Sequence, residues 1–581
     1  MVKKIQSIPI SKYESPNAFE GDDTLSRVNI PDGVTLIGDK AFKDCTNLSR
    51  IVIPDSVTSI GKNAFEGCMS LSSISLSQNV KLIGDNAFDK CFSLSRITIP
   101  NGVRSIGKEA FSGCGLASIR IPDTVTSIDD GTFSFCSSLK SIVIPSNVKS
   151  IGKLAFAECS SLSRIVIKDG VVSIADGAFS RCDSLSKIVL PSTLERIDGN
   201  PFVEWNGEIV CSSPQYQYQN GVLIDKKNNT LVAFCSQPKS NILPQEGDLF
   251  GETQTSASDE DGIGEGALDS CPTLSSFKIP SGIKEIGENA FKTCDSLSNV
   301  IIPDEVESIG KGSFSYCGSL NSVMIPNSVT KINERTFANS TSLLNITIPN
   351  SVTYIGAGAF EGCSSLSSIV IPEGVTYIGN RAFFMCDSLS KIVLPSTLEE
   401  IDGNPFIDWD GELVCLSPHF QYENNVLIDK KRRKIIAFRS QEKSYNVPAG
   451  ILGIGAHAFE NQRWNLESVI LPDSVAYIGD SAFSFCKSLK SVVLPDSITH
   501  IGDSAFCACI SLSQVKLSDS IESIGNDAFC QCFSLSSITL PDKLISIGQG
   551  AFADCDSLSE SFSEKLHTRF GKKLFERYFR L

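Results

Sequence analysis

Histidine is scarce in this sequence, which has four histidines among 581 residues. They are His419, His457, His500 and His567, too scattered to indicate a Ser-His-Asp triad or a histidine metal site. The glycines of the frequent I-G-x-x-A-F segments never form the G-x-G-x-x-G pattern of a phosphate-binding loop. The sequence therefore predicts no catalytic residues, no cofactor and no metal, and we expect that the chain is not an enzyme.

Long apolar segments are also absent. No apolar run approaches the roughly 18 residues that cross a bilayer, so we expect no integral membrane segment. The segment from Met1 to Ile10 has two lysines but lacks the apolar stretch of about 7 to 15 residues that a secretory signal needs, and Pro9 interrupts it. We therefore expect no signal peptide at this end.

A basic surplus is missing as well. The formal net charge is −15 and the pI is about 4.9. Nucleic acids and anionic membranes attract proteins that present a basic surface. The charge therefore argues against nucleic acid and against a membrane surface as the main partner.

The sequence does contain one pattern, I-P-x-x-V-T-x-I-G-x-x-A-F-x-x-C-x-S-L-S-x-I, which occurs about 21 times. Its phenylalanine returns every 23 residues at Phe42, Phe65, Phe88 and Phe111. A fixed short period is the signature of a solenoid. A unit of this size cannot enclose a core alone, so each repeat must bury its apolar side against its neighbours.

Each repeat predicts two short strands and a turn. Residues 48–53 alternate apolar and polar side chains like a half-buried strand, which Pro54 ends because it has no N–H to donate. Residues 57–60 form a second extended piece, and the apolar positions in 64–68 suit one turn of α-helix or 3-10 helix. Stacked repeats then give parallel β-sheets around one apolar column.

Two of these repeats carry a family resemblance. Ile53-Pro-Asp-Ser-Val-Thr-Ser-Ile-Gly-Lys-Asn-Ala-Phe-Glu-Gly-Cys68 and Ile371-Pro-Glu-Gly-Val-Thr-Tyr-Ile-Gly-Asn-Arg-Ala-Phe-Phe-Met-Cys386 resemble the BspA-type (treponemal) leucine-rich repeat. The resemblance extends over about 480 of the 581 residues. It implies a leucine-rich repeat solenoid that binds proteins, often as a surface or secreted adhesin for host, matrix or microbial proteins. It leaves the ligand and the oligomeric state open.

The repeats are interrupted twice by similar segments, Ile197 to Trp205 recurring as Ile401 to Trp409 at an offset of 204 residues. We expect a β-hairpin in each insert, such as the one predicted by 222–224 and 231–234, and a mobile acidic loop at 251–261. The tryptophans replace the repeat cysteine and are expected to plug the core where each insert leaves. The predicted segments are repeat block 1 (1–206), a hairpin insert with the acidic loop (207–262), repeat block 2 (263–410), a hairpin insert (411–450), repeat block 3 (451–557) and a C-terminal amphipathic capping helix (558–581).

The C-terminal segment has two interpretations. Apolar residues recur at helical spacing from Leu566 to Leu581. A solenoid needs a cap on its last core layer, which favours a capping helix. Basic residues around the same apolar stripe leave open a helix for a membrane surface or a partner groove.

Sixteen of the 21 cysteines occupy one position, three residues after the repeat phenylalanine, as Cys45 and Cys68 do. Stacking gives a straight row with parallel side chains, which suits neither disulfides nor tetrahedral zinc. We expect Cys91, Cys159 and Cys363 to be small buried hydrophobes, which fits a reducing compartment better than an oxidising one. Two extra cysteines directly after the phenylalanine, Cys507 and Cys530, are expected to face solvent, with oxidation, a shared metal or no role as alternatives.

Two rows are candidates for protein binding. The first comprises outward residues of the first strand of each repeat, where the basic members are Arg50, Arg96, Arg120, Arg164 and Lys187. The second lies just before the isoleucine of I-G and contains Tyr354, Tyr377 and Tyr477. The alternatives are ordinary solvated side chains for the first row and an aromatic ladder that only covers the sheet for the second.

These observations predict a non-catalytic protein-binding repeat protein. The family resemblance favours an adhesin-like protein at the cell surface or secreted from the cell. An intracellular scaffold or regulator in the cytoplasm is the alternative, favoured by the missing signal peptide and by the cysteine row.

Overall fold

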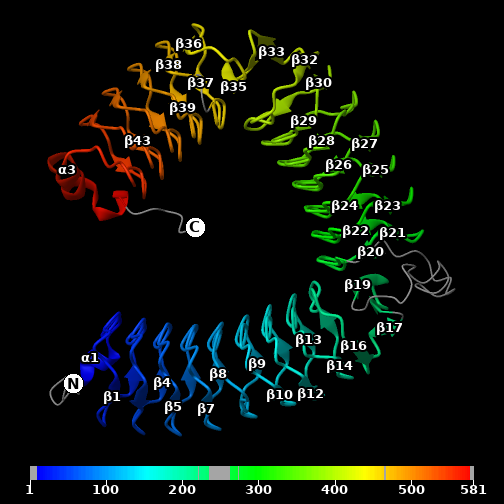
Figure 1. Cartoon of the computed structure of the whole chain (residues 1–581), viewed down its shortest axis with the longest axis vertical. Helices are drawn as coiled ribbons and strands as arrows, with labels where there is room; N and C mark the ends of the chain where they lie inside the picture. The colour runs from blue at the N-terminus through cyan, green and yellow to red at the C-terminus, as the bar shows by residue number, and fades with distance from the viewer. Residues whose placement is uncertain (1–8, 220, 235–261, 273, 463–465, 576–581) are drawn as a thin grey trace. The chain divides into compact units, whose positions relative to one another are not determined.

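The structure is a computed structural model that describes residues 9–219, 221–234, 262–272, 274–462 and 466–575 (Figure 1). The chain divides into two compact units, Met1–Ser296 (unit 1) and Leu297–Leu581 (unit 2). The division falls inside the segment expected as repeat block 2. The acidic stretch 251–261 lies outside the described residues.

The first strand of most repeats has three or four residues and pairs in parallel with its neighbour 23 residues away, as Arg50 does with Ser73. At Ser118 and Ser368 the pairing is reduced to an isolated bridge. In unit 1 these strands are β1 (Arg27–Asn29), β3 (Arg50–Val52), β5 (Ser73–Ser75), β7 (Arg96–Thr98), β10 (Ser141–Ile144), β12 (Arg164–Ile167), β14 (Lys187–Leu190), β16 (Glu208–Cys211) and β21 (Ser276–Lys278). In unit 2 they are β23 (Asn299–Ile301), β25 (Ser322–Met324), β27 (Asn345–Thr347), β30 (Lys391–Leu394), β32 (Glu412–Cys415), β36 (Ser444–Asn446), β38 (Ser468–Ile470), β40 (Ser491–Val493), β42 (Gln514–Lys516) and β44 (Ser537–Thr539).

The second strand of each repeat has only two residues and builds a second parallel sheet. In unit 1 these strands are β2 (Leu36–Ile37), β4 (Ser59–Ile60), β6 (Leu82–Ile83), β8 (Ser105–Ile106), β9 (Ser127–Ile128), β11 (Ser150–Ile151), β13 (Ser173–Ile174), β15 (Arg196–Ile197), β20 (Gly262–Ile263) and β22 (Glu285–Ile286). In unit 2 they are β24 (Ser308–Ile309), β26 (Lys331–Ile332), β28 (Tyr354–Ile355), β29 (Tyr377–Ile378), β31 (Glu400–Ile401), β37 (Gly453–Ile454), β39 (Tyr477–Ile478), β41 (His500–Ile501), β43 (Ser523–Ile524) and β45 (Ser546–Ile547). The predicted solenoid of parallel sheets is confirmed.

Each insert is a three-stranded antiparallel meander, in which the predicted hairpin is joined by one further strand that the sequence did not indicate. The strands are β17 (Tyr216–Gln219), β18 (Val222–Asp225) and β19 (Thr230–Phe234) in the first insert, and β33 (Phe420–Glu423), β34 (Val426–Asp429) and β35 (Lys434–Phe438) in the second. The last strand of each meander then pairs in parallel with the next repeat, as Leu231 does with Ile263. Trp205 and Trp409 are buried, and their indole N–H groups donate to the carbonyls of Leu185 and Leu389 at 2.6 Å.

The core is a column of stacked phenylalanines. Phe42, Phe65 and Phe88 are fully buried, with centroids 5.4 and 5.3 Å apart and ring planes within 7° of parallel. At that separation the rings are offset, which is a favoured aromatic arrangement. Each ring therefore contacts the repeat before and the repeat after it.

The turn around the phenylalanine is built differently from the expected helical turn. The amides of Ala41, Lys43 and Cys45 bond to carbonyls three residues back, whereas those of Lys40, Phe42 and Asp44 bond to the next repeat. Lys40 and Asp44 adopt left-handed φ values of 54° and 56°. Alternating local and inter-repeat bonds explain why no helix forms there, because a helix would direct every amide to its own chain segment.

The cysteine row is buried, as predicted for Cys91, Cys159 and Cys363. The sequence did not reveal that each thiol also donates a hydrogen bond, such as that from Cys136 Sγ to the Phe111 carbonyl at 3.2 Å. Ser340 occupies this position in one repeat, where its hydroxyl donates to the Phe314 carbonyl at 2.7 Å. The position therefore selects a small side chain that can donate to the preceding repeat.

Both ends of the repeat column are covered. Helix α1 (Ile10–Glu14), which the sequence did not predict, buries Tyr13 against Phe19 at 5.4 Å between ring centroids. At the other end, α3 (Glu560–Phe570) ends at Gly571 and is followed by the 3-10 helix η1 (Lys572–Phe575). Leu566 and Leu574 are buried against the last core layer, and residues 576–581 lie outside the described ranges.

Phe314→Ala should destabilise unit 2 by about 3 to 5 kcal/mol, because the ring is fully buried and stacks on Phe337 at 5.6 Å. Hydrogen exchange should show local loss of protection around residues 290–340 before the ends melt. Tyr316→Ala, at an exposed position of the same turn, is the matched control. Uniform loss of protection along the chain would contradict this prediction.

Cys136→Ser should reduce the loss of stability at alkaline pH. Burial raises the pKa of the Cys136 thiol to about 12, whereas an unfolded thiol ionises near pH 8.5. Above about pH 8.5 the thiol is ionised in the unfolded chain but remains protonated in the native protein. Rising pH therefore favours the unfolded chain, and each such thiol lowers the free energy of unfolding by up to about 1.4 kcal/mol per pH unit. Serine keeps the hydrogen bond, as Ser340 does, but does not ionise.

The measurement is urea unfolding in reductant at pH 7.5 and pH 10. The variant should lose about 2 kcal/mol less than the parent between these values. Equal losses in the two proteins would show that this thiol does not contribute to the pH dependence.

Candidate functional site

The first candidate surface is the basic row of unit 1, defined as Arg27, Arg50, Arg96, Arg164 and Lys187. These residues take the same position in the first strand of their repeats, and all are exposed. Arg27 and Arg50 are direct register partners, so their strands lie about 4.8 Å apart. The sequence missed Arg27 as a member.

Arg120 lies in the neighbouring column of the same face. Ser118, two residues earlier, pairs with Ser141, which pairs with Arg164. Arg120 therefore aligns with Val143, one side-chain position further along the strand. The structure thus groups four of the five predicted basic residues in one column and places the fifth beside it.

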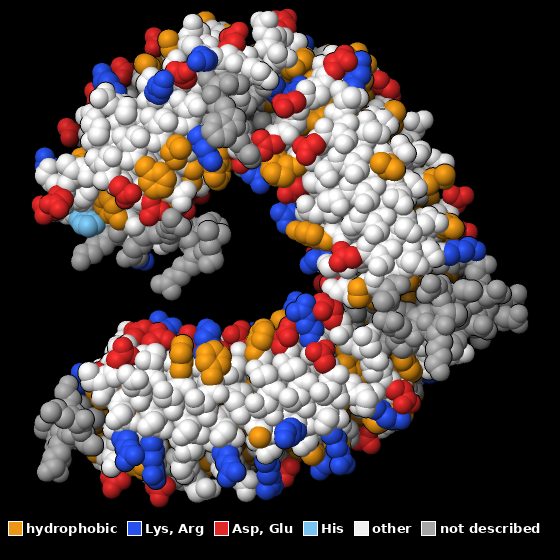
Figure 2. All heavy atoms as spheres, viewed as in Figure 1, with side chains coloured by type: hydrophobic (Ala, Val, Ile, Leu, Met, Phe, Trp, Pro, Cys, Tyr) orange, Lys and Arg blue, Asp and Glu red, His pale blue; other side chains and the backbone are white. Residues whose placement is uncertain are grey.

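The charges of the basic row are largely uncompensated. The first acidic residue in the column is Glu208, which pairs with Lys187 at 3.2 Å. Lys187 is the only member of the row that forms an ion pair within the described part of the chain. Figure 2 shows Lys and Arg side chains gathered along this edge of unit 1. An acidic chain therefore presents a local cationic strip.

Exposed apolar side chains lie beside the basic row. Val52, Val143 and Val189 occupy the neighbouring outward column and are all exposed. In unit 2 the equivalent face carries few charges. The column that matches the basic row is mostly Asn and Ser, and the neighbouring column is mostly apolar, with Met324 74% exposed and Val370 78% exposed. The sequence analysis missed this contrast between the units. Strand alternation identifies the outward residues, so comparing them between the two units would have revealed it.

The predicted tyrosine row is not a single surface. Tyr354 and Tyr377 stack at 4.6 Å with planes 7° apart and are half-buried, and burial raises the pKa of Tyr377 to about 12. Tyr477 is separated from them by the second insert and lies over Gly453, where a Cβ would come within 2.2 Å of its ring. These contacts favour aromatic side chains that cover the short-strand sheet.

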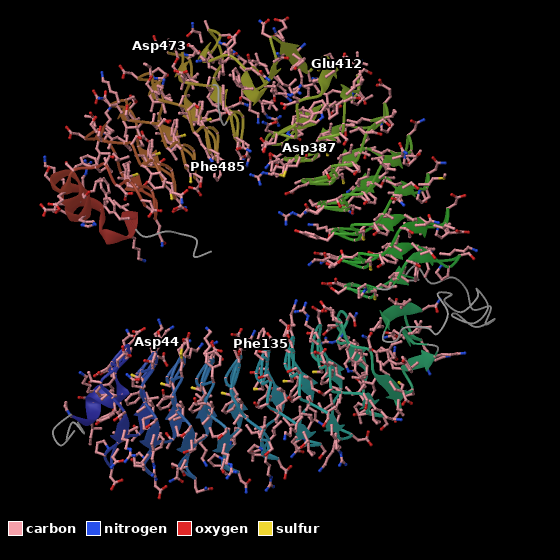
Figure 3. All side chains as sticks on the ribbon, in the orientation of Figure 1. Asp44, Phe135, Asp387, Glu412, Asp473 and Phe485 are labelled. Carbon is pink, nitrogen blue, oxygen red and sulfur yellow. The ribbon has the colours of Figure 1, made fainter. Side chains whose placement is uncertain are left out.

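A groove of about 590 Å³ runs along the opposite edge of unit 1, over the turns. We call it the Phe135 groove, after a side chain that is 59% exposed on its rim and lies on that edge in Figure 3. Phe135 adopts a left-handed φ of 56°, which is unfavourable for a bulky residue. The sequence analysis did not identify this groove.

Charged residues line the Phe135 groove. The Arg181 guanidinium bridges Glu158 at 2.8 Å and Glu204 at 2.7 Å, so its charge is neutralised locally. Burial raises the pKa of the Asp269 carboxyl, which accepts a hydrogen bond from Ser270 at 3.0 Å. At the other end, Glu109 accepts from the Asn86 amide at 3.0 Å.

A smaller pocket of about 280 Å³ lies at the second insert. The Arg439 guanidinium sits 4.4 Å from the Trp409 ring and donates to the carbonyls of Trp409 at 3.1 Å and Gly411 at 2.6 Å. Nearby, the buried Glu460 carboxylate pairs with Arg381 at 2.7 Å and with His457. These groups bind one another, which indicates that they anchor the insert to the repeats.

The expectation that Cys507 and Cys530 face solvent is wrong. Cys507 is half-buried and Cys530 is 7% exposed. The position after the repeat phenylalanine is covered by side chains of the adjoining turns, so that even the charged Asp89 is only 4% exposed there. The two thiols are close enough to hydrogen-bond to each other, which raises the pKa of Cys507.

Two further properties bear on function. Among the described residues, no group of three or more His, Cys, Asp and Glu side chains is arranged to hold a metal ion. In the same ranges, no helix combines the length and the apolar character needed to cross a bilayer.

Comparison with protein families gives a match to the BspA type leucine rich repeat region (6 copies) at residues 13–137, 104–210, 261–383 and 453–580. Comparison with curated proteins gives no match.

Several solved structures are similar to the chain. A leucine rich cell surface protein from Faecalibacterium prausnitzii is 30% identical, with 63% of this chain and 86% of that chain covered and a TM-score of 0.43. A leucine-rich repeat protein from Bacteroides ovatus is 26% identical, with 68% and 93% covered and a TM-score of 0.35. The T. pallidum leucine rich repeat protein is 35% identical, with 28% and 78% covered and a TM-score of 0.27.

Phe135→Asn should leave the free energy of unfolding unchanged or raise it by up to about 1 kcal/mol. The exposed ring contributes little packing, and asparagine tolerates the left-handed backbone better than phenylalanine does. Asn339 and Asn461 already occupy this turn position with φ values of 59° and 66°. Urea denaturation provides the measurement, and Phe133→Asn, in the core of the same turn, should be strongly destabilising. A loss above about 2 kcal/mol for Phe135→Asn would contradict the prediction.

Proposed function

We propose that this chain, which belongs to the BspA-type leucine-rich repeat family, is a non-catalytic, adhesin-like protein that binds an acidic segment of a partner protein along the basic row. The observation that carries the proposal is the cationic strip on a chain of net charge −15. A partner segment with carboxylates would be drawn to it, and the exposed valines would contact apolar side chains between those carboxylates. Host, matrix or microbial surface proteins are the proposed partners.

A location at the cell surface or outside the cell is part of this proposal. Its support is the family membership together with the likeness to the leucine rich cell surface protein from Faecalibacterium prausnitzii. A cytoplasmic scaffold or regulator is the second candidate. The observation that favours it is the row of buried, free thiols, since extracellular proteins more often carry disulfides. Fractionation of the native cells separates the two.

Reversing Arg50 and Arg96 to Glu should weaken binding of an acidic partner by at least about tenfold, or about 1.4 kcal/mol. The probe is a fluorescein-labelled peptide of alternating Glu and Val, measured by anisotropy at about 50 and about 300 mM salt. The affinity of the variant should also depend less on salt than that of the parent, because the variant has lost exposed charge contacts that salt screens. Stability should change by no more than about 0.5 kcal/mol, as is usual for surface sites.

Lys81→Glu with Arg104→Glu is the matched control, because both residues are exposed in unit 1 outside the basic row. This control changes the net charge by the same amount as the reversal of Arg50 and Arg96, and it should retain most of the affinity for the peptide. Binding that survives the reversal of Arg50 and Arg96 but is lost on Tyr354→Ala with Tyr377→Ala would assign the function to the tyrosine surface. If neither pair matters, the proposal for both rows is wrong, and the duplicated hairpins around Lys226 and Lys430 become the next candidates.

A further inference from the structure

We infer that the Phe135 groove is a second binding site, for an extended peptide segment of a partner that carries an apolar side chain between two cationic ones. This site goes beyond the proposed function. It lies on the turn edge of unit 1, opposite the strands that carry the basic row, and it prefers the opposite charge (Figures 1 and 3).

The groove lies where the residue after the repeat phenylalanine is small in four successive turns. Its floor is formed by Ser112, Ser134, Ala157 and Ser180. In other repeats this position holds either a large side chain, such as Phe384 or Ile407, or a small one, such as Ser315. The depth of the floor therefore depends on the size of the side chain at this one repeat position.

The rims of the groove provide the apolar contact. Phe135 is 59% exposed and Leu154 is 43% exposed, and both line the groove. Both also adopt left-handed φ values, 56° and 54°, which bulky residues rarely take. Strained backbone that presents apolar side chains to solvent is typical of a binding surface. One apolar side chain of a partner would be held between them.

The charge of the partner follows from the groove's carboxylates. Arg181 is already neutralised by Glu158 and Glu204. Glu109 lies at the first turn and Asp269 at the last, and neither forms an ion pair within the described residues. Cationic side chains at the two ends of a bound segment would complement these two carboxylates.

The length of the segment follows from the stacking of the turns. The ring centroids from Phe111 to Phe202 are separated by four steps of 5.5 to 5.9 Å, or about 23 Å. An extended chain advances about 3.3 Å per residue, so about seven residues span the turns from Phe111 to Phe202. A long cationic side chain at the end of the segment would reach Asp269 in the next turn. The predicted occupant is a seven-residue segment with Lys or Arg near both ends and a Leu- or Phe-like residue in the middle.

The test uses a fluorescein-labelled probe, Lys-Gly-Ala-Leu-Ala-Gly-Lys, and the full-length chain. The parent protein should bind this peptide at least about tenfold more tightly than versions with Glu for both Lys or Ser for Leu. Phe135→Asn and Ala157→Ile should each weaken binding by about tenfold, the first by removing a rim and the second by filling the floor as Ile407 does elsewhere. Phe485→Asn, at the equivalent left-handed position of unit 2, should bind like the parent.

Two further variants separate charge from shape. Glu109→Gln with Asp269→Asn should weaken binding of the Lys peptide but not of a peptide with Gln in place of Lys. Arg50→Glu with Arg96→Glu should leave groove binding intact, so failure of the proposed function and failure of this inference are distinguishable. Equal binding of the Lys and Glu peptides, or unchanged binding by both Phe135→Asn and Ala157→Ile, would overturn the inference. If the parent protein does not bind the peptide but self-associates with rising concentration, and if Phe135→Asn abolishes that association, the inference of a peptide ligand is wrong. The occupant of the groove is then a second copy of the chain.

Discussion

The fold depends on hydrogen bonds that no repeat can complete alone. In each turn every second amide, such as those of Lys40, Phe42 and Asp44, donates to the following repeat. An isolated turn would leave these groups without partners, and burying an unpaired amide costs about 1 to 3 kcal/mol. Most thiols of the cysteine row repeat the same arrangement in the core, because they donate to the phenylalanine carbonyl of the repeat before them, as Cys68 and Cys136 do. Register between repeats is therefore fixed by the backbone and the core together, which is why the period stays near 23 residues.

Because of this constraint, only the outward-facing residues of each repeat can vary without disturbing the fold. We therefore expect residues that bind a partner to lie in these outward columns. The duplicated blocks show how. Residues 204 positions apart occupy equivalent sites, and Lys187 and Val189 recur as Lys391 and Val393. Arg120 and Arg164, however, correspond to Met324 and Ser368. The same scaffold thus presents a cationic strip in unit 1 and a face with few charges in unit 2. The buried positions keep their character, with exchanges as small as Cys136 to Ser340.

The solenoid, the phenylalanine column and the buried thiols could be predicted from sequence because each is a local pattern repeated many times. The outward direction of the basic residues followed from strand alternation. The column of Arg120 did not, because one repeat there is a residue shorter, with Phe111 and Phe133 only 22 residues apart. The Phe135 groove, the burial of Cys530 and helix α1 could not be predicted. The exposure of the residue that follows the repeat phenylalanine depends on side chains of the neighbouring turns, which the repeat pattern does not describe. Helix α1 precedes the periodic segment, so the repeat pattern does not predict it either.

The two surfaces of unit 1 are physically separate. The basic row lies on the long strands, whereas turn residues line the Phe135 groove. The long strands and the turns form opposite edges of unit 1 (Figure 1). Substitutions on surfaces that share no partners act almost independently. Opposite charge preferences prevent one short segment from satisfying both surfaces. A partner that engages both must offer an acidic segment and a basic one, and joining the two through one chain converts the second contact into an intramolecular one. Moderate affinity at each surface then suffices for strong attachment.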